Sequence, residues 1–271
     1  MSRGLPSSES SLIFETARAL FASAGLESPE LEARFFADAF AGQEEATIRD
    51  LLRRRLTGEP FAYLEGSRGF WKHEFRVTPD VLIPRPDSEV LVEWALELIP
   101  ALGVETLLDL GTGSGCLLLS IMSDLPDLDG IGVDLSLAAL EIARENGDRL
   151  NLADRVQWVQ SSWLEGVCLP RRGLLVANPP YIEPQEEVGP GVREHEPHQA
   201  LFAPPGDPLA CYRVILNQVA DGGPSGFPVL FEVGAQRMEA LCGLAESLGF
   251  QVVGQRNDFG GVPRALYLCR N

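Results

Sequence analysis

The stretch Asp109-Leu110-Gly111-Thr112-Gly113-Ser114-Gly115 decides the fold, because it joins an apolar segment at 106–109 to a helical pattern at 116–123. Glycines in a strand-to-helix turn keep the turn tight and let the backbone approach a ligand. Beyond Asp87 the chain alternates strand and helix patterns, which is typical of a mostly parallel sheet with helices on both faces. We therefore predict an α/β domain built around this turn.

Seven strands are predicted in this domain. They fall at residues 106–109, 130–134, 156–160, 174–178, 228–233, 251–255 and 265–269. The helical patterns lie at 87–99, 116–123, 137–150, 209–220 and 236–248. A loop as short as 257–263 cannot make a right-handed parallel crossover. The last two strands are therefore expected to pair antiparallel, which gives a seven-stranded sheet with a reversed edge.

The residues before this domain show a different organisation. Between residues 10 and 57 apolar residues recur at helical spacing in three short helices, one of which opens at Ser28-Pro29 with an N-cap and a first-turn proline. Residues 69–77 are typical of a β-hairpin with its turn near Lys72-His73. The expected domains are a helical domain over 1–66, a β-hairpin connector over 67–86 and the α/β domain over 87–271.

Charge and composition argue against several classes of protein. With 39 acidic against 22 basic residues the net charge is -17, so the field of the protein would repel a phosphate backbone, and nucleic acid is a disfavoured partner. No apolar stretch approaches the roughly 18 residues that a membrane span requires. Five scattered cysteines without a Cys-x-x-Cys pair suit reduced thiols. We expect a soluble cytoplasmic monomer.

The glycine turn and Asp134 together indicate a ligand that carries adenosine. Asp134 ends the next predicted strand about twenty residues further on, where a carboxylate accepts hydrogen bonds from both hydroxyls of a ribose. A dinucleotide site spaces its glycines as Gly-x-Gly-x-x-Gly, whereas here the order is Gly-x-Gly-x-Gly after Asp109, whose charge would repel a diphosphate but could hold an ammonium. The pattern favours S-adenosylmethionine. In a purely structural alternative, the glycines pack helix on strand and Asp134 is a helix N-cap.

Trp163 and two histidines are weaker candidates. The ring of Trp163, after the third predicted strand, can stack on adenine or fill the core, and the sequence favours neither. His195 and His198 invite a metal or general-base interpretation, but no other His or Cys stands at ligand spacing. We predict an exposed loop beside the site, and no metal.

The tetrapeptide Asn178-Pro179-Pro180-Tyr181 follows an apolar run at 173–177. The side-chain carbonyl of Asn178 and the backbone carbonyl of Pro179 can together accept both hydrogens of a planar NH2 group, while the prolines hold the backbone extended. An amide nitrogen is a poor nucleophile, so an enzyme gains most by holding it in line with an electrophile. In the alternative, the tetrapeptide is only a turn that ends a strand.

A family resemblance is carried by segments spread over most of the chain. They are 54–60 with Tyr63 and Gly66, Phe70-Trp71, 82–89, the glycine turn, Asp134, 178–182, Glu196-Pro197 and Ala200-Leu201. In these segments the chain resembles the protein-(glutamine-N5) methyltransferases of the PrmC/HemK type, which modify the glutamine of the Gly-Gly-Gln motif in class 1 peptide release factors. The discriminating segment is Ile83-Pro84-Arg85-Pro86, since DNA adenine methyltransferases share the tetrapeptide at Asn178.

The resemblance implies a Rossmann-like, class I S-adenosylmethionine-dependent methyltransferase fold, with S-adenosylhomocysteine as product and an N-terminal helical domain that recognises the release factor. The implied donor-binding residues are Asp109, Gly111, Thr112, Gly113, Ser114, Gly115, Asp134, Trp163 and Asn178. The implied substrate-binding residues are Asn178, Pro179, Pro180, Tyr181 and Arg85, of which Asn178, Pro179 and Tyr181 would be catalytic. Tyr181 would pack on the amide plane. Ser161-Ser162 stand where the family commonly has Gly-Asp.

Rival functions stay open from the sequence. Methylation of adenine in DNA or RNA uses the same tetrapeptide for an exocyclic amino group, although the acidic charge weighs against it. A glutamine of a ribosomal protein is a further possible target. A non-catalytic protein that had kept the fold would bind the donor and transfer nothing.

Overall fold

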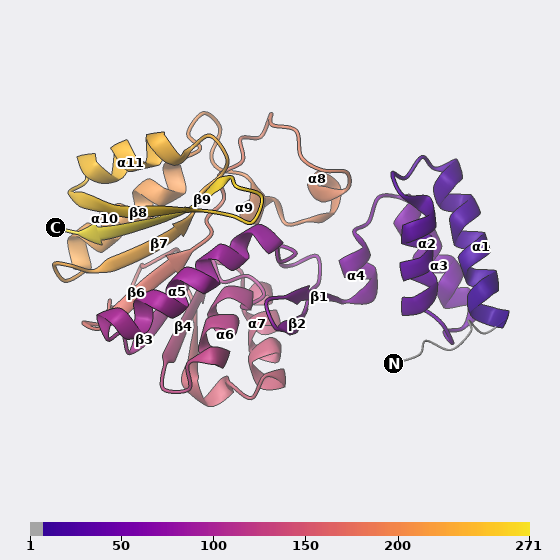
Figure 1. Cartoon of the computed structure of the whole chain (residues 1–271), viewed down its shortest axis with the longest axis horizontal. Helices are drawn as coiled ribbons and strands as arrows, with labels where there is room; N and C mark the ends of the chain where they lie inside the picture. The colour runs from indigo at the N-terminus through magenta and orange to yellow at the C-terminus, as the bar shows by residue number, and fades with distance from the viewer. Residues whose placement is uncertain (1–7) are drawn as a thin grey trace. The chain divides into compact units, whose positions relative to one another are not determined.

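The residues that the structure describes, 8–271, form two compact units in this computed structural model (Figure 1). The smaller unit holds the helices up to Gly66 together with Gly189–His195. The larger unit holds Ser67–Val188 and Glu196–Asn271. Across the described residues, no helix has both the length and the apolar character that crossing a membrane requires.

The smaller unit is helical. Its helices before Gly66 are α1 (Ser8–Ser23), α2 (Pro29–Ala39), α3 (Glu45–Leu56) and α4 (Phe61–Glu65). Pro29 opens α2, where its fixed φ suits the first turn and its missing N–H breaks no hydrogen bond. Phe36 packs edge to face on both Phe21 and Phe40 in the core. The sequence predicted three helices here and missed α4, because five residues are too few to show a helical period.

Residues 189–195, which include α8 (Val192–His195), belong to the smaller unit although they lie far along the chain. Gly191 comes so close to Gly58 that a Cβ on Gly191 would lie 2.1 Å from the Gly58 carbonyl oxygen. The His195 Nε2 atom lies 3.2 Å from the Thr57 carbonyl oxygen. These contacts are long-range, and no local pattern in the sequence announces them.

The larger unit begins with a hairpin of β1 (Ser67–Phe70) and β2 (His73–Arg76). Phe70 pairs with His73, so the hairpin is present as predicted and its turn is Trp71-Lys72, one residue before Lys72-His73. Trp71 has a φ of 54°, and its backbone N–H donates a hydrogen bond to Glu89 Oε1 at 2.9 Å. This tertiary contact holds the turn one residue earlier than the local sequence indicates.

A seven-stranded sheet of order β5-β4-β3-β6-β7-β9-β8 forms the centre of the larger unit. The strands are β3 (Thr106–Leu110), β4 (Asp129–Asp134), β5 (Val156–Gln160), β6 (Gly173–Ala177), β7 (Pro228–Glu232), β8 (Phe250–Asn257) and β9 (Pro263–Arg270). β5, β4, β3, β6 and β7 are parallel, while β9 runs antiparallel to both β7 and β8. The predicted α/β fold class and its reversed edge are confirmed.

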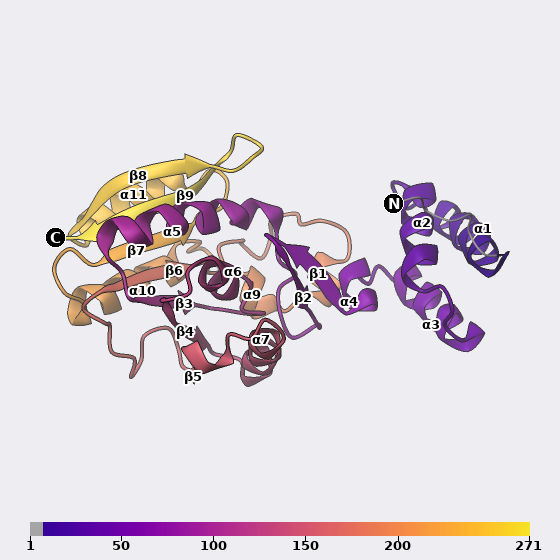
Figure 2. The same ribbon diagram turned by 60° about the horizontal axis from the view of Figure 1, so that its bottom comes forward.

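Helices cover both faces of this sheet (Figure 2). The helical elements are η1 (Pro86–Ser88), α5 (Glu89–Leu102), α6 (Cys116–Asp124), α7 (Leu137–Arg149), η2 (Ala153–Arg155), α9 (His198–Leu201), α10 (Ala210–Gly222) and α11 (Met238–Ser247). α5 and α6 share one buried apolar cluster with one face of the sheet. α10 and α11 share a second cluster with the opposite face.

The strand order reverses between β3 and β6. Leu110 at the end of β3 pairs with Ala177 at the end of β6, so the glycine turn and Asn178 leave neighbouring strands at the same edge of the sheet. Ligands of open α/β sheets bind outside the carboxyl ends of strands at such a switch point. All residues of β6 are buried, which gives Asn178 a fixed base.

Candidate active site

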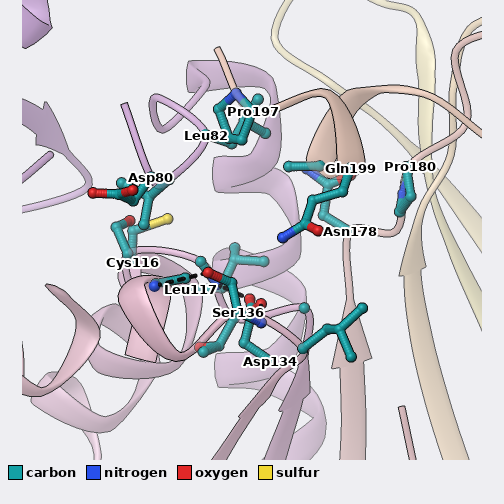
Figure 3. A pocket seen from close by; sticks show the side chains of 18 of the residues that line it. Asp80, Leu82, Cys116, Leu117, Asp134, Ser136, Asn178, Pro180, Pro197 and Gln199 are labelled. Carbon is teal, nitrogen blue, oxygen red and sulfur yellow. Dashed lines mark hydrogen bonds between the residues drawn. The ribbon is translucent and has the colours of Figure 1, made fainter. Parts of the chain in front are cut away.

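A pocket lies at this switch point (Figure 3). The residues that line it are Asp80, Val81, Leu82, Pro84, Arg85, Ser88, Gly111, Thr112, Gly113, Ser114, Cys116, Leu117, Asp134, Leu135, Ser136, Ala139, Ser161, Ser162, Trp163, Asn178, Pro180, Pro197, Gln199 and Ala200. Most of the residues predicted for the site are therefore brought together. Asp109, Gly115, Pro179 and Tyr181 lie outside this lining set.

The glycines of the turn divide between two roles. Gly111, Gly113 and Gly115 have φ values of 71°, 54° and 79°, a region that favours glycine. A Cβ on Gly113 would meet nothing within 4 Å, and this glycine lines the pocket. A Cβ on Gly115 would lie 3.1 Å from Leu119 and 3.3 Å from Ala143. Gly113 thus leaves room for a ligand, while Gly115 lets the turn pack on the helices.

Asp134 presents an oriented carboxylate to the pocket. Its Oδ2 accepts a hydrogen bond from the Gly113 N–H and its Oδ1 accepts one from the Ser136 N–H, both at 2.9 Å. Ser136 is the N-cap of α7, with its side chain accepting from the Ala139 N–H, so the helix is not capped by Asp134. A carboxylate has about four lone-pair sites, so Asp134 keeps acceptor capacity for a ligand hydroxyl.

Asp109 lies beneath the glycine turn. It is 1% exposed, and its Oδ2 accepts a hydrogen bond of 2.7 Å from the Thr112 hydroxyl. Burial raises the pKa of this carboxyl to about 7, against the lowering effect of the Thr112 bond. Among the described residues, none makes a hydrogen bond of good geometry with the other oxygen, Oδ1.

Trp163 lies between the pocket and the core. Its ring lines the pocket and also packs against the apolar cluster beneath α10 and α11. A Cβ on Gly111 would lie 3.5 Å from this ring, so the glycine turn and the indole are in close proximity. Ser161 and Ser162 line the pocket beside it.

Asn178 lines the pocket and is held by a hydrogen-bond network that extends to Glu232 at the end of β7. Its Nδ2 donates a hydrogen bond of 3.5 Å to Ser88 Oγ, and the Ser88 hydroxyl donates to Glu232 Oε2. The Tyr181 hydroxyl donates to the other oxygen of Glu232 at 3.4 Å. The Tyr181 ring lies against Gly234, where a Cβ would come within 2.5 Å of it. The tetrapeptide is thus anchored at Asn178 and at Tyr181.

A buried carboxylate also joins two segments of the pocket wall. Glu196 is 3% exposed and accepts hydrogen bonds from the Ile83 N–H at 3.2 Å and from Arg85 Nη2 at 2.5 Å. Through Glu196 the segment with Ile83 and Arg85 is held to the segment with Pro197 and Gln199, all within the larger unit. Leu82 and Pro197, both labelled in Figure 3, line the pocket at this wall.

Sequence reasoning missed several residues of the site. Ser88, Ser136, Gln199 and Glu232 were not singled out, although Glu232 carried a signal, since it is a charged residue at the end of a strand that is otherwise apolar. Neither His195 nor His198 lines the pocket. Among the described residues, no group of three or more His, Cys, Asp or Glu side chains could hold a metal.

The fold is the one found in class I methyltransferases. Residues 88–194 match the methyltransferase small domain family. The structure is similar to a methyltransferase from Pyrococcus furiosus, with a TM-score of 0.52 and 16% identity over 83% of this chain and 98% of that one. It is also similar to a Thermus thermophilus 16S rRNA methyltransferase in complex with AdoMet and guanosine, with a TM-score of 0.54 and 20% identity over 76% of this chain and 50% of that one.

Sequence relatives identify the family. The chain is 38% identical to the release factor glutamine methyltransferase of Bradyrhizobium diazoefficiens, over 93% of this chain and 91% of the relative. It is also 38% identical to the enzyme of the same name from Bordetella pertussis, over 90% and 96%. The chain belongs to the release factor glutamine methyltransferase family, and its members are S-adenosylmethionine-dependent enzymes.

Proposed function

We propose that this protein transfers a methyl group from S-adenosylmethionine to the side-chain nitrogen N5 of the glutamine in the Gly-Gly-Gln motif of class 1 peptide release factors. The proposal is supported by the names of relatives that match at nearly full length. The observation that carries it is that Asn178 lines the same pocket as Asp134 and the glycine turn. The residue proposed to bind the amide group and the residues proposed to bind adenosine thus line one pocket.

The residues around the glycine turn fit the donor. The Asp134 carboxylate, oriented by two backbone N–H groups, suits the two ribose hydroxyls. The wall along the methionyl part of the donor would be formed by Gly111, Thr112, Gly113 and Ser114. Asp109 Oδ1 is buried without a hydrogen-bond partner of good geometry, so it suits the nearby ammonium of the methionyl part. We assign the Trp163 ring to the adenine side.

The glutamine would be held at the opposite wall. In this proposal the Asn178 side-chain carbonyl and the Pro179 backbone carbonyl accept the two hydrogens of the amide NH2 group. Pro180 and Tyr181 fix the backbone that carries these carbonyls, because Tyr181 is anchored on Glu232 and Gly234. Arg85 is held by Glu196 and lines the same pocket, and we assign it to the substrate side.

The chemistry then depends on orientation. S-adenosylmethionine, when bound, supplies a methyl group on a positively charged sulfur. Asn178 and Pro179 aim the amide nitrogen at that carbon and favour the pyramidal nitrogen that develops as its lone pair is used. The nitrogen forms the new bond to carbon, the carbon–sulfur bond breaks, and the proton of the amide leaves to water. In our proposal no metal takes part.

The helical unit is our candidate for recognition of the release factor. Its helices expose large apolar side chains, with Leu12 at 71%, Leu31 at 52% and Phe35 at 54%. Leu31 and Phe35 stand four residues apart on α2 and so share one face of that helix, and neighbouring exposed apolar side chains are a feature of protein contact sites. We place the reaction in the cytoplasm, which suits five cysteines that are free thiols, and assign it to the monomer.

Mass spectrometry of the substrate tests this function. The protein is incubated with S-adenosylmethionine and a class 1 release factor, and the Gly-Gly-Gln peptide is analysed for a mass increase of one CH2 group. A release factor in which that Gln is replaced by Asn is the matched control and gains nothing. Methyl transfer to DNA or RNA instead, or to no substrate while the donor binds, would overturn the proposal.

A further inference from the structure

A relay of three side chains leads from the pocket into the core. It consists of Asn178 after β6, Ser88 at the end of η1 and Glu232 at the end of β7. Ser88 is 4% exposed and Glu232 is 2% exposed, while Asn178 is partly exposed in the pocket. These residues are separated by 90 and 144 positions in the chain, so only the tertiary fold brings them together.

The relay has one direction. A carboxylate accepts hydrogen bonds and donates none, so the single proton of the Ser88 hydroxyl is committed to Glu232 Oε2. Toward Asn178 the Ser88 oxygen can then act only as an acceptor, and it accepts a hydrogen bond of 3.5 Å from Asn178 Nδ2. The side-chain carbonyl of Asn178 is thereby turned away from Ser88. Without this constraint the two ends of a carboxamide have nearly the same shape and could exchange places.

We propose that Ser88 and Glu232 are positioning residues that keep the Asn178 carboxamide in the orientation whose oxygen faces the substrate. The inference rests on the proposed function, because it assigns the Asn178 oxygen to the amide NH2 group of glutamine. A flipped Asn178 would present its own NH2 group to the substrate NH2 group, and two donors cannot bond to each other.

Charged and titratable groups face Glu232 from each neighbouring element. Its pKa is raised to about 7, mainly by burial and also by Asp87 from η1, against the lowering effects of Ser88, Arg264 from β9 and the Tyr181 hydroxyl. Cys116 from α6 and Tyr212 from α10 also face it, and burial raises the pKa of both, so they stay neutral near pH 7. Protonated Glu232 can donate a hydrogen bond, which frees the Ser88 proton and removes the fixed direction of the relay.

The relay makes turnover depend on pH with a defined sign. The competent form of Glu232 is the carboxylate, which predominates above its pKa. With saturating donor and substrate, kcat is therefore expected to rise as pH increases through about 7. The donor must be saturating, because Asp109 beneath the glycine turn also has a pKa of about 7 and would otherwise add a pH dependence of donor binding.

Ser88→Ala tests the relay. The expected result is a fall in kcat of about tenfold, the effect of one lost hydrogen bond to a polar group, with unchanged affinity for S-adenosylhomocysteine in equilibrium binding. Ser88→Thr keeps the hydroxyl and is expected to restore most of kcat. Ser120→Ala is the matched control, since Ser120 is a fully buried serine of α6 outside the pocket lining. It should leave kcat unchanged.

Glu232→Gln tests whether the titration of Glu232 causes the pH dependence of kcat. The amide can still accept from Ser88 but does not titrate, so kcat should lose its rise between about pH 6 and pH 8. The inference is overturned if Ser88→Ala keeps kcat within about twofold of the wild type, or if Glu232→Gln keeps the wild-type pH profile. A wild type that methylates no release factor would instead contradict the proposed function, so the two failures are distinguishable.

Discussion

The two walls of the pocket are built in different ways. The wall that we assign to the donor, here called the donor wall, runs from Asp109 to Ser136, is local in the sequence and is shaped by glycine backbone and by N–H groups that hold Asp134. The wall that we assign to the substrate, here called the substrate wall, is assembled by side chains at positions 88, 178 and 232, together with Glu196 and Arg85. A wall shaped by backbone fixes where a common ligand lies, while a wall of linked side chains fixes how a reacting group is oriented. Substitutions should therefore affect affinity on the first wall and turnover on the second.

The largest effect on donor affinity is expected from Asp134→Ala on the donor wall. Two charge-assisted hydrogen bonds to the ribose hydroxyls would be lost, so the Kd for the donor should rise about 100-fold. Because kcat at saturating donor depends on the substrate wall, it should change little. Isothermal titration with S-adenosylhomocysteine, together with single-turnover kinetics, measures both quantities. An equal loss in kcat would show that the walls are not separable.

Gly115→Ala and Gly113→Ala form a matched pair within one turn. Both residues have positive φ, but only at Gly115 would the new Cβ press on Leu119 and Ala143. We expect Gly115→Ala to lower the free energy of unfolding by about 2 kcal/mol and Gly113→Ala by about 1 kcal/mol. Gly113→Ala should weaken donor binding more, since its Cβ points into open space at the pocket. Urea denaturation checks the order, and equal losses of stability would contradict it.

The last prediction concerns stability and pH at Asp109. Its folded-state pKa of about 7 lies above the unfolded value of 3.8, so wild-type stability falls as pH rises through that interval. Asp109→Asn removes the penalty and keeps an acceptor for Thr112. The variant should be more stable than the wild type at pH 8, and by a smaller margin at pH 5. Thermal melts at both pH values measure this difference, and a gain that is larger at pH 5 would reverse the sign.

The sequence predicted the donor wall better than the substrate wall, and the reason is physical. The seven strands and the glycine turn follow from local periodicity and from the backbone freedom of glycine, and the strands end within about two residues of their predicted limits. Asn178 was predicted because an unusual tetrapeptide surrounds it. Ser88 and Glu232 were not linked to it, because a hydrogen bond across 144 positions leaves no periodic signal.

Two structural differences have the same origin. The hairpin turn moved to Trp71-Lys72 because Glu89, distant in the chain, binds the Trp71 N–H. Residues 189–195 joined the helical unit through a close approach of Gly191 to Gly58. In both places a tertiary contact outweighed the local pattern.

The central claim is that Asn178 orients the substrate amide and contributes little to donor affinity. Its most direct test is Asn178→Ala, with kcat on release factor at saturating donor and the Kd for S-adenosylhomocysteine measured on the same preparation. We expect kcat to fall by at least about 100-fold, as for the loss of a preorganised polar contact to a reacting group, while Kd changes by less than about threefold. A variant that methylates release factor at the wild-type rate, or that loses donor affinity as steeply as kcat, would contradict it.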